Sequence, residues 1–292
     1  MAHNGMVPEL PEVNALAADL SVRLSGRTVD RFDIVSFAVL KTFDPPVSAL
    51  AGTTISGVTR HGKFLDIATG DLHVVMHLAR AGWIRWREGA PAPMKGLGRG
   101  PLAARLVLDD GSGIDITEAG TKKSLAIYVV HDPSEVPGVA RLGPDPLSDD
   151  FTEAQFAAIL ASAGRAQIKG VLRNQAVIAG IGNAYSDEIL HTAKMSPFKP
   201  AAMTDDEVAT LYAAMQSTLR DAIARADGLA ASELKREKKS GLQVHGRAGQ
   251  PCPVCGDTVR QVIFHDSTLE YCPTCQTGGK PLADRVLSRL LK

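Results

Sequence analysis

The chain has 292 residues, about twice the commonest size of a single domain, so its length predicts roughly two domains. Hydrophobic residues make up 45% and charged residues 22%, an ordinary globular composition that excludes a disordered or collagen-like chain. Lys plus Arg and Asp plus Glu are 32 each, so any basic surface for nucleic acid must be local. The longest unbroken apolar run, Leu125 to Val130, is far shorter than the roughly 20 residues that span a bilayer. We therefore expect a cytoplasmic protein without a membrane segment or a secretory signal.

The chain opens with one amphipathic helix and continues with a β-rich stretch. Apolar residues recur at helical spacing from Pro11 to Leu24, and Gly26 follows as a stop. Between Val29 and Val130, short β-rich runs are separated by Gly, Asp and Pro turns, with no helical pattern between them. The predicted strands cover 30–37, 53–60, 63–68, 72–78, 104–110, 113–117 and 124–130. This pattern predicts an α+β protein whose N-terminal domain, residues 8–131, is an antiparallel β-sandwich with a leading helix.

A second, all-helical domain follows a linker. Residues 132–150 are rich in Pro, Gly and acid, and beyond them no strand pattern appears for a long stretch. The predicted helices cover 153–163, 167–174, 184–193 and 205–225, with Thr152, Asn183 and Thr204 as N-caps. We place this helical domain at residues 151–249.

All four cysteines lie near the C-terminus, as two C-x2-C pairs separated by 16 residues: Cys252, Cys255, Cys272 and Cys275. Tetrahedral Zn2+ is the physical match, and four thiolates leave no open coordination position, so the metal is predicted to be structural. Residues 258–264 and 268–272 read as the two strands of a zinc-ribbon hairpin. We place the zinc finger at 250–277 and a basic tail at 278–292. The lysine-rich run 235–239 has two interpretations, a solvated surface or a phosphate-binding one.

Three shorter motifs are weak evidence of function when each is taken alone. Gly180 to Asn183 form a glycine-rich turn that leads into a helix start, which suits either a phosphate site or a tight turn between helices. Arg60 to Lys63 form a basic turn between two strands. Glu9 and Glu12 flank the start of the first helix, where acids complement the helix dipole.

The order of these motifs resembles the formamidopyrimidine-DNA glycosylase and endonuclease VIII family of base-excision repair enzymes. The matching segments are PELPEV at 8–13, HGKFLDI at 61–67, HLARAGW at 77–83, LGPDPL at 142–147, IKGVL at 168–172, GIGNAYSDEIL at 180–190, and VHGRAGQPCPVCG through YCPTCQ at 244–276. The resemblance spans nearly the whole chain. It implies a β-sandwich, a helix-two-turns-helix domain and a C-terminal zinc finger, in agreement with the composition and spacing.

The resemblance also implies a chemistry. In this family a free N-terminal proline amine attacks the sugar C1′ of a nucleotide flipped out of damaged double-stranded DNA, and the resulting iminium drives strand elimination. Pro8 matches the amine, Glu9 the acid that assists ring opening, and Lys63 the hairpin lysine at a phosphate beside the lesion; these three form the implied catalytic set. Lys169 and Asn183 match phosphate-binding positions of the helical domain. We expect a monomer with one structural zinc.

Several positions depart from the family pattern. The arginine expected five residues before the third cysteine is Ser267, which removes a phosphate contact. The intercalating methionine is replaced by Arg80, and the second wedge loop by residues 119–126, where Lys122 is a candidate to fill the space left by the flipped base. These positions set lesion preference, so oxidised purine, oxidised pyrimidine and abasic site all stay open.

Pro8 is preceded by residues 1–7, and a proline within a peptide bond has no free amine. We expect the native chain to start at the codon of Val7, read as Met and trimmed before Pro8; initiation at Met6 and a native extension with an inactive lyase are the alternatives. Two functions follow: an active glycosylase with abasic-site lyase activity, or a damaged-DNA or abasic-site binding protein of the same fold without base excision. A zinc-ribbon protein unrelated to DNA is a third reading.

Overall fold

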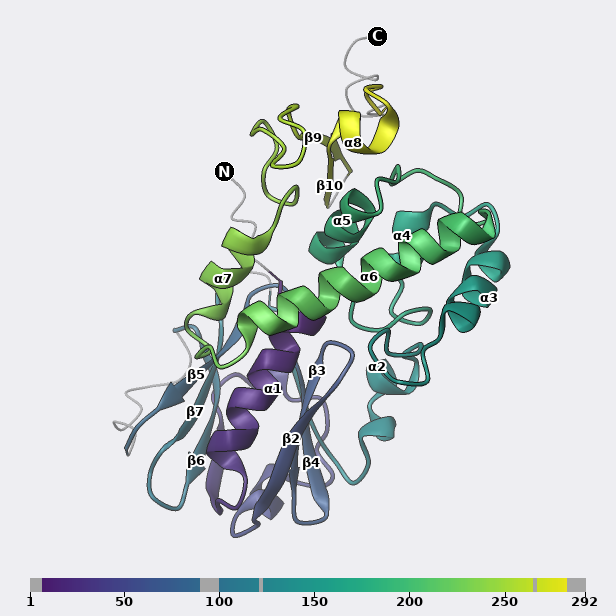
Figure 1. Cartoon of the computed structure of the whole chain (residues 1–292). Helices are drawn as coiled ribbons and strands as arrows, with labels where there is room; N and C mark the ends of the chain where they lie inside the picture. The colour runs from purple at the N-terminus through teal and green to yellow at the C-terminus, as the bar shows by residue number, and fades with distance from the viewer. Residues whose placement is uncertain (1–6, 90–99, 121–122, 265–266, 283–292) are drawn as a thin grey trace. The chain divides into compact units, whose positions relative to one another are not determined.

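The computed structural model describes residues 7–89, 100–120, 123–264 and 267–282, and its chain divides into two compact units (Figure 1). Unit 1 contains the residues up to 142 together with 226–235. Unit 2 contains residues 143–225 and those from 236 onward. Each unit has its own hydrophobic core.

Unit 1 is a β-sandwich with one long helix beside it. Its elements are α1 (Leu10–Leu24), β1 (Val29–Ile34), β2 (Ile55–His61), β3 (Phe64–Thr69), β4 (Leu72–His77), β5 (Gly82–Arg87), β6 (Leu102–Leu108), β7 (Gly113–Glu118) and β8 (Ala126–Val130). Within the described residues, these strands form two antiparallel four-stranded sheets, in the orders β1-β6-β7-β5 and β2-β3-β4-β8. The predicted α+β fold with an N-terminal sandwich is confirmed.

Helix α1 forms where the periodicity predicts it. Its apolar stripe, which includes Val13, Leu16 and Leu20, is buried in the sandwich core. Glu12 in the first turn accepts the backbone N–H of Glu9 at 2.9 Å, and this bond satisfies one of the amides that a helix start leaves without an intrahelical partner. The helix ends before Gly26, whose φ of +78° suits glycine.

The sequence analysis missed strand β5. This strand carries Arg85 and Arg87 between tryptophans, and the charges obscure its apolar pattern. In the structure Asp115 of β7 lies opposite Arg85 in the sheet register. Its carboxylate binds Arg105 of β6 at 2.7 and 2.8 Å and is also 3.5 Å from Nε of Arg87. Such cross-strand compensation depends on the register, which the spacing along one strand does not reveal.

Unit 2 combines helices with the zinc-finger hairpin. Its elements are α3 (Glu153–Ala163), α4 (Ile168–Arg173), α5 (Asn183–Thr192), α6 (Asp205–Ala226, which ends in unit 1), β9 (Arg260–Ile263), β10 (Thr268–Tyr271) and α8 (Pro273–Thr277). Thr152 and Thr204 cap α3 and α6, as predicted. Asn183 does not cap α5: Gly182 occupies the N-cap, and the Asn183 side chain is turned toward the hairpin.

The stretch expected to be a linker, residues 132–150, is folded. It contains α2 (Pro137–Ala140), and Val136 packs against Val75 and Val130 of the sandwich. From Gly143 onward the chain belongs to unit 2, where the Gly143 N–H bonds the carbonyl of Gln175. The lysine-rich run lies on α7 (Leu234–Gly241), and its Lys238 is buried over the ring of Tyr185. Within the described residues, no helix has the length and apolar character needed to cross a membrane.

Candidate functional site

The predicted site residues of unit 1 gather at one end of the sandwich. The register aligns four strand ends there: His61 with Phe64, Phe64 with His77, and His77 with Ala126. Gly82 at the start of β5 pairs with Glu118 at the end of β7, so the connections into β5 and out of β7 leave from the same end. This end therefore presents the turn of Lys63, the turn of Arg80 and the loop after Glu118.

The N-terminus of α1 lies at the same end. The N–H of Gly26, just after the helix, bonds the carbonyl of Ile55 at the start of β2. Helix α1 runs along β2, and both elements are about 22 Å long, so the helix begins near the end of β2. A hydrogen bond of 3.2 Å from Arg60 Nε to Asn14 Oδ1 supports this alignment. Pro8 and Glu9, which are both buried, thus lie at the end that carries Lys63.

Lys63 stands in a two-residue turn between β2 and β3. The turn needs Gly62, whose φ is +55°. His77 pairs with Phe64 in the register, and its ring packs against the Phe64 ring at a tilt of 49°, with centroids 4.7 Å apart. Burial, with a smaller contribution from the Lys63 charge, lowers the pKa of His77 to about 4, so this imidazole is neutral at physiological pH. His77 was not singled out from the sequence, and its place beside Lys63 was not predicted.

Arg80 lies in a tight turn between β4 and β5, and its side chain is exposed. The Gly82 N–H closes the turn on the carbonyl of Leu78 at 2.8 Å, and a Cβ at Gly82 would come within 2.2 Å of that oxygen. Ala79 has a φ of +51°, which costs a non-glycine residue of order 1 kcal/mol. The turn is therefore a strained, defined structure that projects Arg80 outward.

The loop after β7 is anchored by Glu118, which the sequence analysis did not single out. The buried carboxylate of Glu118 accepts the N–H groups of Ser124 and Leu125 at 2.6 and 2.9 Å, and the Lys123 ammonium bonds the Glu118 carbonyl. These bonds fix Lys123, Ser124 and Leu125 to the end of β7. Lys122 itself lies outside the described residues.

In unit 2, Asn183 and Lys169 lie together at the start of α5. The Asn183 amide donates to the carbonyl of Thr268 at 2.8 Å, next to Ser267, so the structure brings Asn183 and the Ser267 position together. The Lys169 ammonium is buried, and it bonds the Asn183 carbonyl at 3.1 Å and the Asp187 carboxylate at 2.6 Å. The Lys169 charge is therefore neutralised inside unit 2.

The glycine-rich turn before α5 is held by Gln175, another residue that the sequence analysis did not identify. The Gln175 side chain accepts the N–H of Gly180 at 2.9 Å and donates to the carbonyl of Ile181 at 2.6 Å. One amide thus satisfies both sides of the turn. No local pattern predicts this role.

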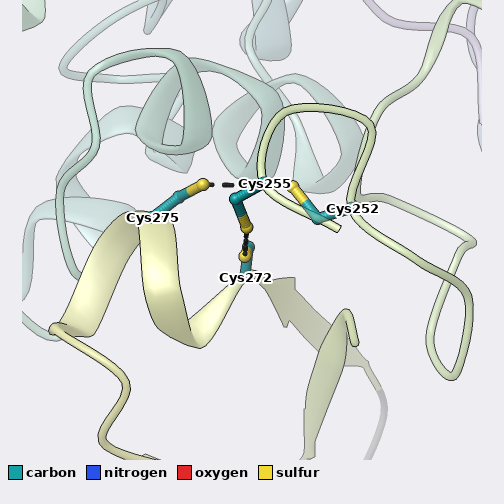
Figure 2. A group of neighbouring side chains, drawn as sticks. All are labelled: Cys252, Cys255, Cys272 and Cys275. Atoms are coloured by element: carbon teal, nitrogen blue, oxygen red, sulfur yellow. Dashed lines mark hydrogen bonds between the residues drawn. The ribbon is translucent and has the colours of Figure 1, made fainter. Parts of the chain in front are cut away.

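The four cysteines form a metal centre. Figure 2 shows their sulfur atoms gathered around one point. Two Sγ pairs, Cys252 with Cys275 and Cys255 with Cys272, are 4.0 and 3.3 Å apart. These values bracket the roughly 3.8 Å separation of sulfurs around a tetrahedral zinc with Zn–S bonds of about 2.3 Å. The cluster therefore fits one structural zinc, as predicted.

Thiol chemistry supports the same assignment. Burial raises the pKa of Cys272 to about 11, whereas the backbone N–H of Asp257 holds the pKa of Cys255 below its usual range. A cation is needed to keep all four thiols deprotonated together. His191 lies 3.3 Å from Cys252 Sγ through Nε2 and so supports one ligand from α5, a contact that sequence spacing did not reveal.

Each of the three predicted parts of the chain matches a domain of known proteins. The formamidopyrimidine-DNA glycosylase N-terminal domain matches residues 7–119, the formamidopyrimidine-DNA glycosylase H2TH domain matches 142–233, and the zinc finger found in FPG and IleRS matches 249–278. A formamidopyrimidine-DNA glycosylase of Symbiobacterium thermophilum is 35% identical over 92% of this chain and 89% of its own length. This chain belongs to the formamidopyrimidine-DNA glycosylase family.

Two further relatives agree. An uncharacterized formamidopyrimidine-DNA glycosylase-like protein of Mycobacterium tuberculosis is 57% identical over 52% of this chain and 94% of its own length. The Lactococcus lactis formamidopyrimidine-DNA glycosylase, solved non-covalently bound to DNA that contains an AP site, has a TM-score of 0.78 and 26% identity, covering 92% of this chain and 99% of that one. Members of the family are base-excision repair DNA glycosylases, and AP lyase activity is typical of them, so the predicted class of enzyme is confirmed.

Proposed function

We propose that the chain excises a damaged base and cleaves the resulting abasic site through an iminium at Pro8. The observation that carries this proposal is the convergence of Pro8, Glu9 and Lys63 at one end of the sandwich, on elements that share a single hydrophobic core. A nucleophile, an acid and a cation on rigid elements are what such chemistry requires.

Each residue has one role in this reaction. The Pro8 nitrogen forms a bond to the sugar C1′ while the bond from C1′ to the base breaks, and the base takes up the proton that the amine loses. Glu9 then protonates the ring oxygen of the sugar as the ring opens to the iminium. The positive iminium then acidifies the C2′ proton, and its loss expels the 3′ phosphate. Lys63 holds a phosphate of the bent backbone during these steps. The reaction requires a secondary amine at Pro8, so it requires a chain that begins there.

Unit 2 contributes the remaining phosphate contact. Asn183 stands at the positive end of α5, where an amide and backbone N–H groups suit an anion. Lys169 supports this contact indirectly, through the Asn183 carbonyl. Arg80 or Lys122 fills the space left by the flipped base. We further propose that the partner is double-stranded DNA, that the protein acts as a monomer, and that it works in the cytoplasm.

Borohydride trapping on an abasic-site duplex tests the proposal. Borohydride reduces the iminium to a stable amine, so protein and DNA become covalently linked only if the amine has attacked. A chain that begins at Pro8 is expected to trap efficiently, its Pro8→Gly variant much less, and the 292-residue form hardly at all.

The matched control changes only the amine. Acetylation of the N-terminal nitrogen of the chain beginning at Pro8 removes the nucleophile without altering any side chain, and it is expected to abolish trapping. If the chain beginning at Pro8 binds the duplex but is not trapped, the second function, damaged-DNA binding without base excision, replaces the proposal. If the acetylated chain still traps, another amine is the nucleophile.

A further inference from the structure

A buried group of charges joins α5 to the zinc hairpin in unit 2, and apart from Lys169 its members have no role in the reaction above. Asp187 on α5, Glu270 on β10 and Lys169 on α4 are at most 5% exposed. His245, in the segment between α7 and the first cysteine pair, lies among them. Charges are rarely buried unless they are paired, so each charge of this group is expected to have a partner of opposite charge.

His245 connects the two carboxylates. Its Nδ1 lies 2.8 Å from Asp187 Oδ2 and 3.4 Å from Glu270 Oε2. An ionised carboxylate only accepts hydrogen bonds, so Nδ1 must carry a proton. The other Asp187 oxygen is 2.6 Å from the Lys169 ammonium, and Glu270 also accepts the Gly246 N–H.

The charge balance favours an imidazolium. Asp187 and Glu270 contribute two negative charges and Lys169 one positive charge, so a second positive charge at His245 makes the group neutral. Glu188, a further buried carboxylate beside Asp187, accepts the N–H groups of residues 243–245. Asp187, His245 and Glu270 could also hold a metal ion, and the zinc content measured below distinguishes that site from an ion pair.

We propose that His245 is a positioning residue, an imidazolium that ties β10 to α5 and so fixes the zinc hairpin beside Asn183. The contact that transmits the effect is the bond from the Asn183 amide to the Thr268 carbonyl, at the first residue of β10. With His245 neutral, Asp187 and Glu270 repel each other, and β10 is held less firmly on α5. This inference rests on the proposed function only for its effect on DNA binding, because the hairpin contact exists without DNA.

Zinc release to a chelator, measured without DNA, tests the hairpin contact. In the full zinc-loaded chain, His245→Gln keeps a hydrogen-bonding side chain but cannot carry the charge. We expect zinc release at least about fivefold faster than in the parent, because a charge-assisted bond is lost. Glu270→Gln, which retains an acceptor for the Gly246 N–H, is expected to shift release in the same direction. His131→Gln, at an exposed imidazole of unit 1, is the matched control and is expected to change nothing.

DNA binding supplies the second measurement. His245→Gln is expected to weaken binding to an abasic-site duplex several-fold with an unchanged salt slope, because no phosphate contact is lost. The ratio of parent to variant affinity is expected to fall toward one as the pH rises and the parent imidazolium loses its proton.

Three results would overturn the inference. If zinc release is unchanged in both His245→Gln and Glu270→Gln, His245 does not hold β10 on α5. A salt slope reduced by about 1 makes His245 a direct phosphate ligand. Two zinc ions in the parent and one in His245→Gln make the group a second metal site. If the parent binds no abasic duplex while zinc release responds as expected, the proposed function fails and the hairpin contact stands.

Discussion

Unit 1 holds Pro8, Lys63 and Arg80 at the ends of a helix and strands that share one large hydrophobic core. Unit 2 holds Asn183 and Ser267 through buried charges and a metal centre. The core of unit 1 collects apolar side chains from α1 and from both sheets. The zinc finger has two small apolar clusters: Val244 and Val259 with cysteines, and Val262, Leu269 and Tyr271 on the hairpin strands. A knuckle of this size buries too little apolar surface to fold alone, so the metal takes the place of the missing core.

The apolar core of unit 1 and the metal and ion pairs of unit 2 respond to different solution conditions. Apolar burial is insensitive to chelators and only weakly sensitive to salt, whereas metal ligation and buried ion pairs depend on pH and on each partner being present. The residues of unit 1 that we propose to face DNA are therefore expected to keep their structure under treatments that disorder the proposed DNA-binding residues of unit 2. The predictions below test this contrast.

The largest expected effect is Cys272→Ser. Structural zinc binding in small fingers is worth about 10 kcal/mol or more, so removing one ligand is expected to unfold the segment from 250 to 277. Unit 1 is expected to stay folded. Both tryptophans of the chain, Trp83 and Trp86, lie on β5, so their fluorescence reports on unit 1 alone. Zinc content should fall to zero while the tryptophan unfolding curve stays in place; a shift of that curve would show that the two units are coupled.

His77 provides a pH test of unit 1. Its folded pKa is about 4 and its unfolded value about 6.5. Between these values the unfolded chain binds a proton that the folded chain does not, so stability rises with pH through this window and is complete above about 6.5. The full effect is up to about 3 kcal/mol. His77→Gln is expected to flatten the dependence, as followed by tryptophan fluorescence in urea, and His131→Gln is the exposed control. A curve that stays equally steep in His77→Gln would assign the pH dependence to other groups.

The features that the sequence predicted are those with a short-range signal. Helical periodicity located α1, alternating apolar runs located seven of the eight sandwich strands in the described residues, and the cysteine spacing located the zinc. The features that it missed depend on partners distant in sequence. Asn183 has a good capping side chain, yet its amide bonds Thr268, 85 residues away. The pairing of His245 with Asp187, 58 residues apart, has no local pattern either.

Substitutions of Lys63 and Lys169 are expected to differ in their effect on the salt dependence of duplex binding. Lys63 stands in an external turn, so Lys63→Ala is expected to weaken duplex binding and lower the salt slope by about 1, the value for one phosphate contact. Lys169 is buried against Asp187, so Lys169→Ala is expected to weaken binding without changing the slope. Arg141→Ala, at an exposed arginine of unit 1, is the control. A slope reduced equally by both lysine variants would mean that Lys169 leaves Asp187 to contact phosphate.

The smallest expected effect is a gain at Ser267. The Ser267 carbonyl accepts the N–H of Phe264 at 2.8 Å to close the hairpin turn, a backbone bond that a new side chain leaves intact. Thr268, the next residue, already contacts Asn183, so an arginine at 267 would stand beside the expected phosphate ligand of α5. Ser267→Arg is therefore expected to tighten binding to an abasic-site duplex several-fold and to raise the salt slope by about 1. Ser267→Gln has a comparable reach without the charge and should change neither quantity. Because the hairpin depends on zinc, chelation should cancel the gain from Ser267→Arg and leave the contribution of Lys63 untouched; a gain that persists without zinc would place the new contact elsewhere.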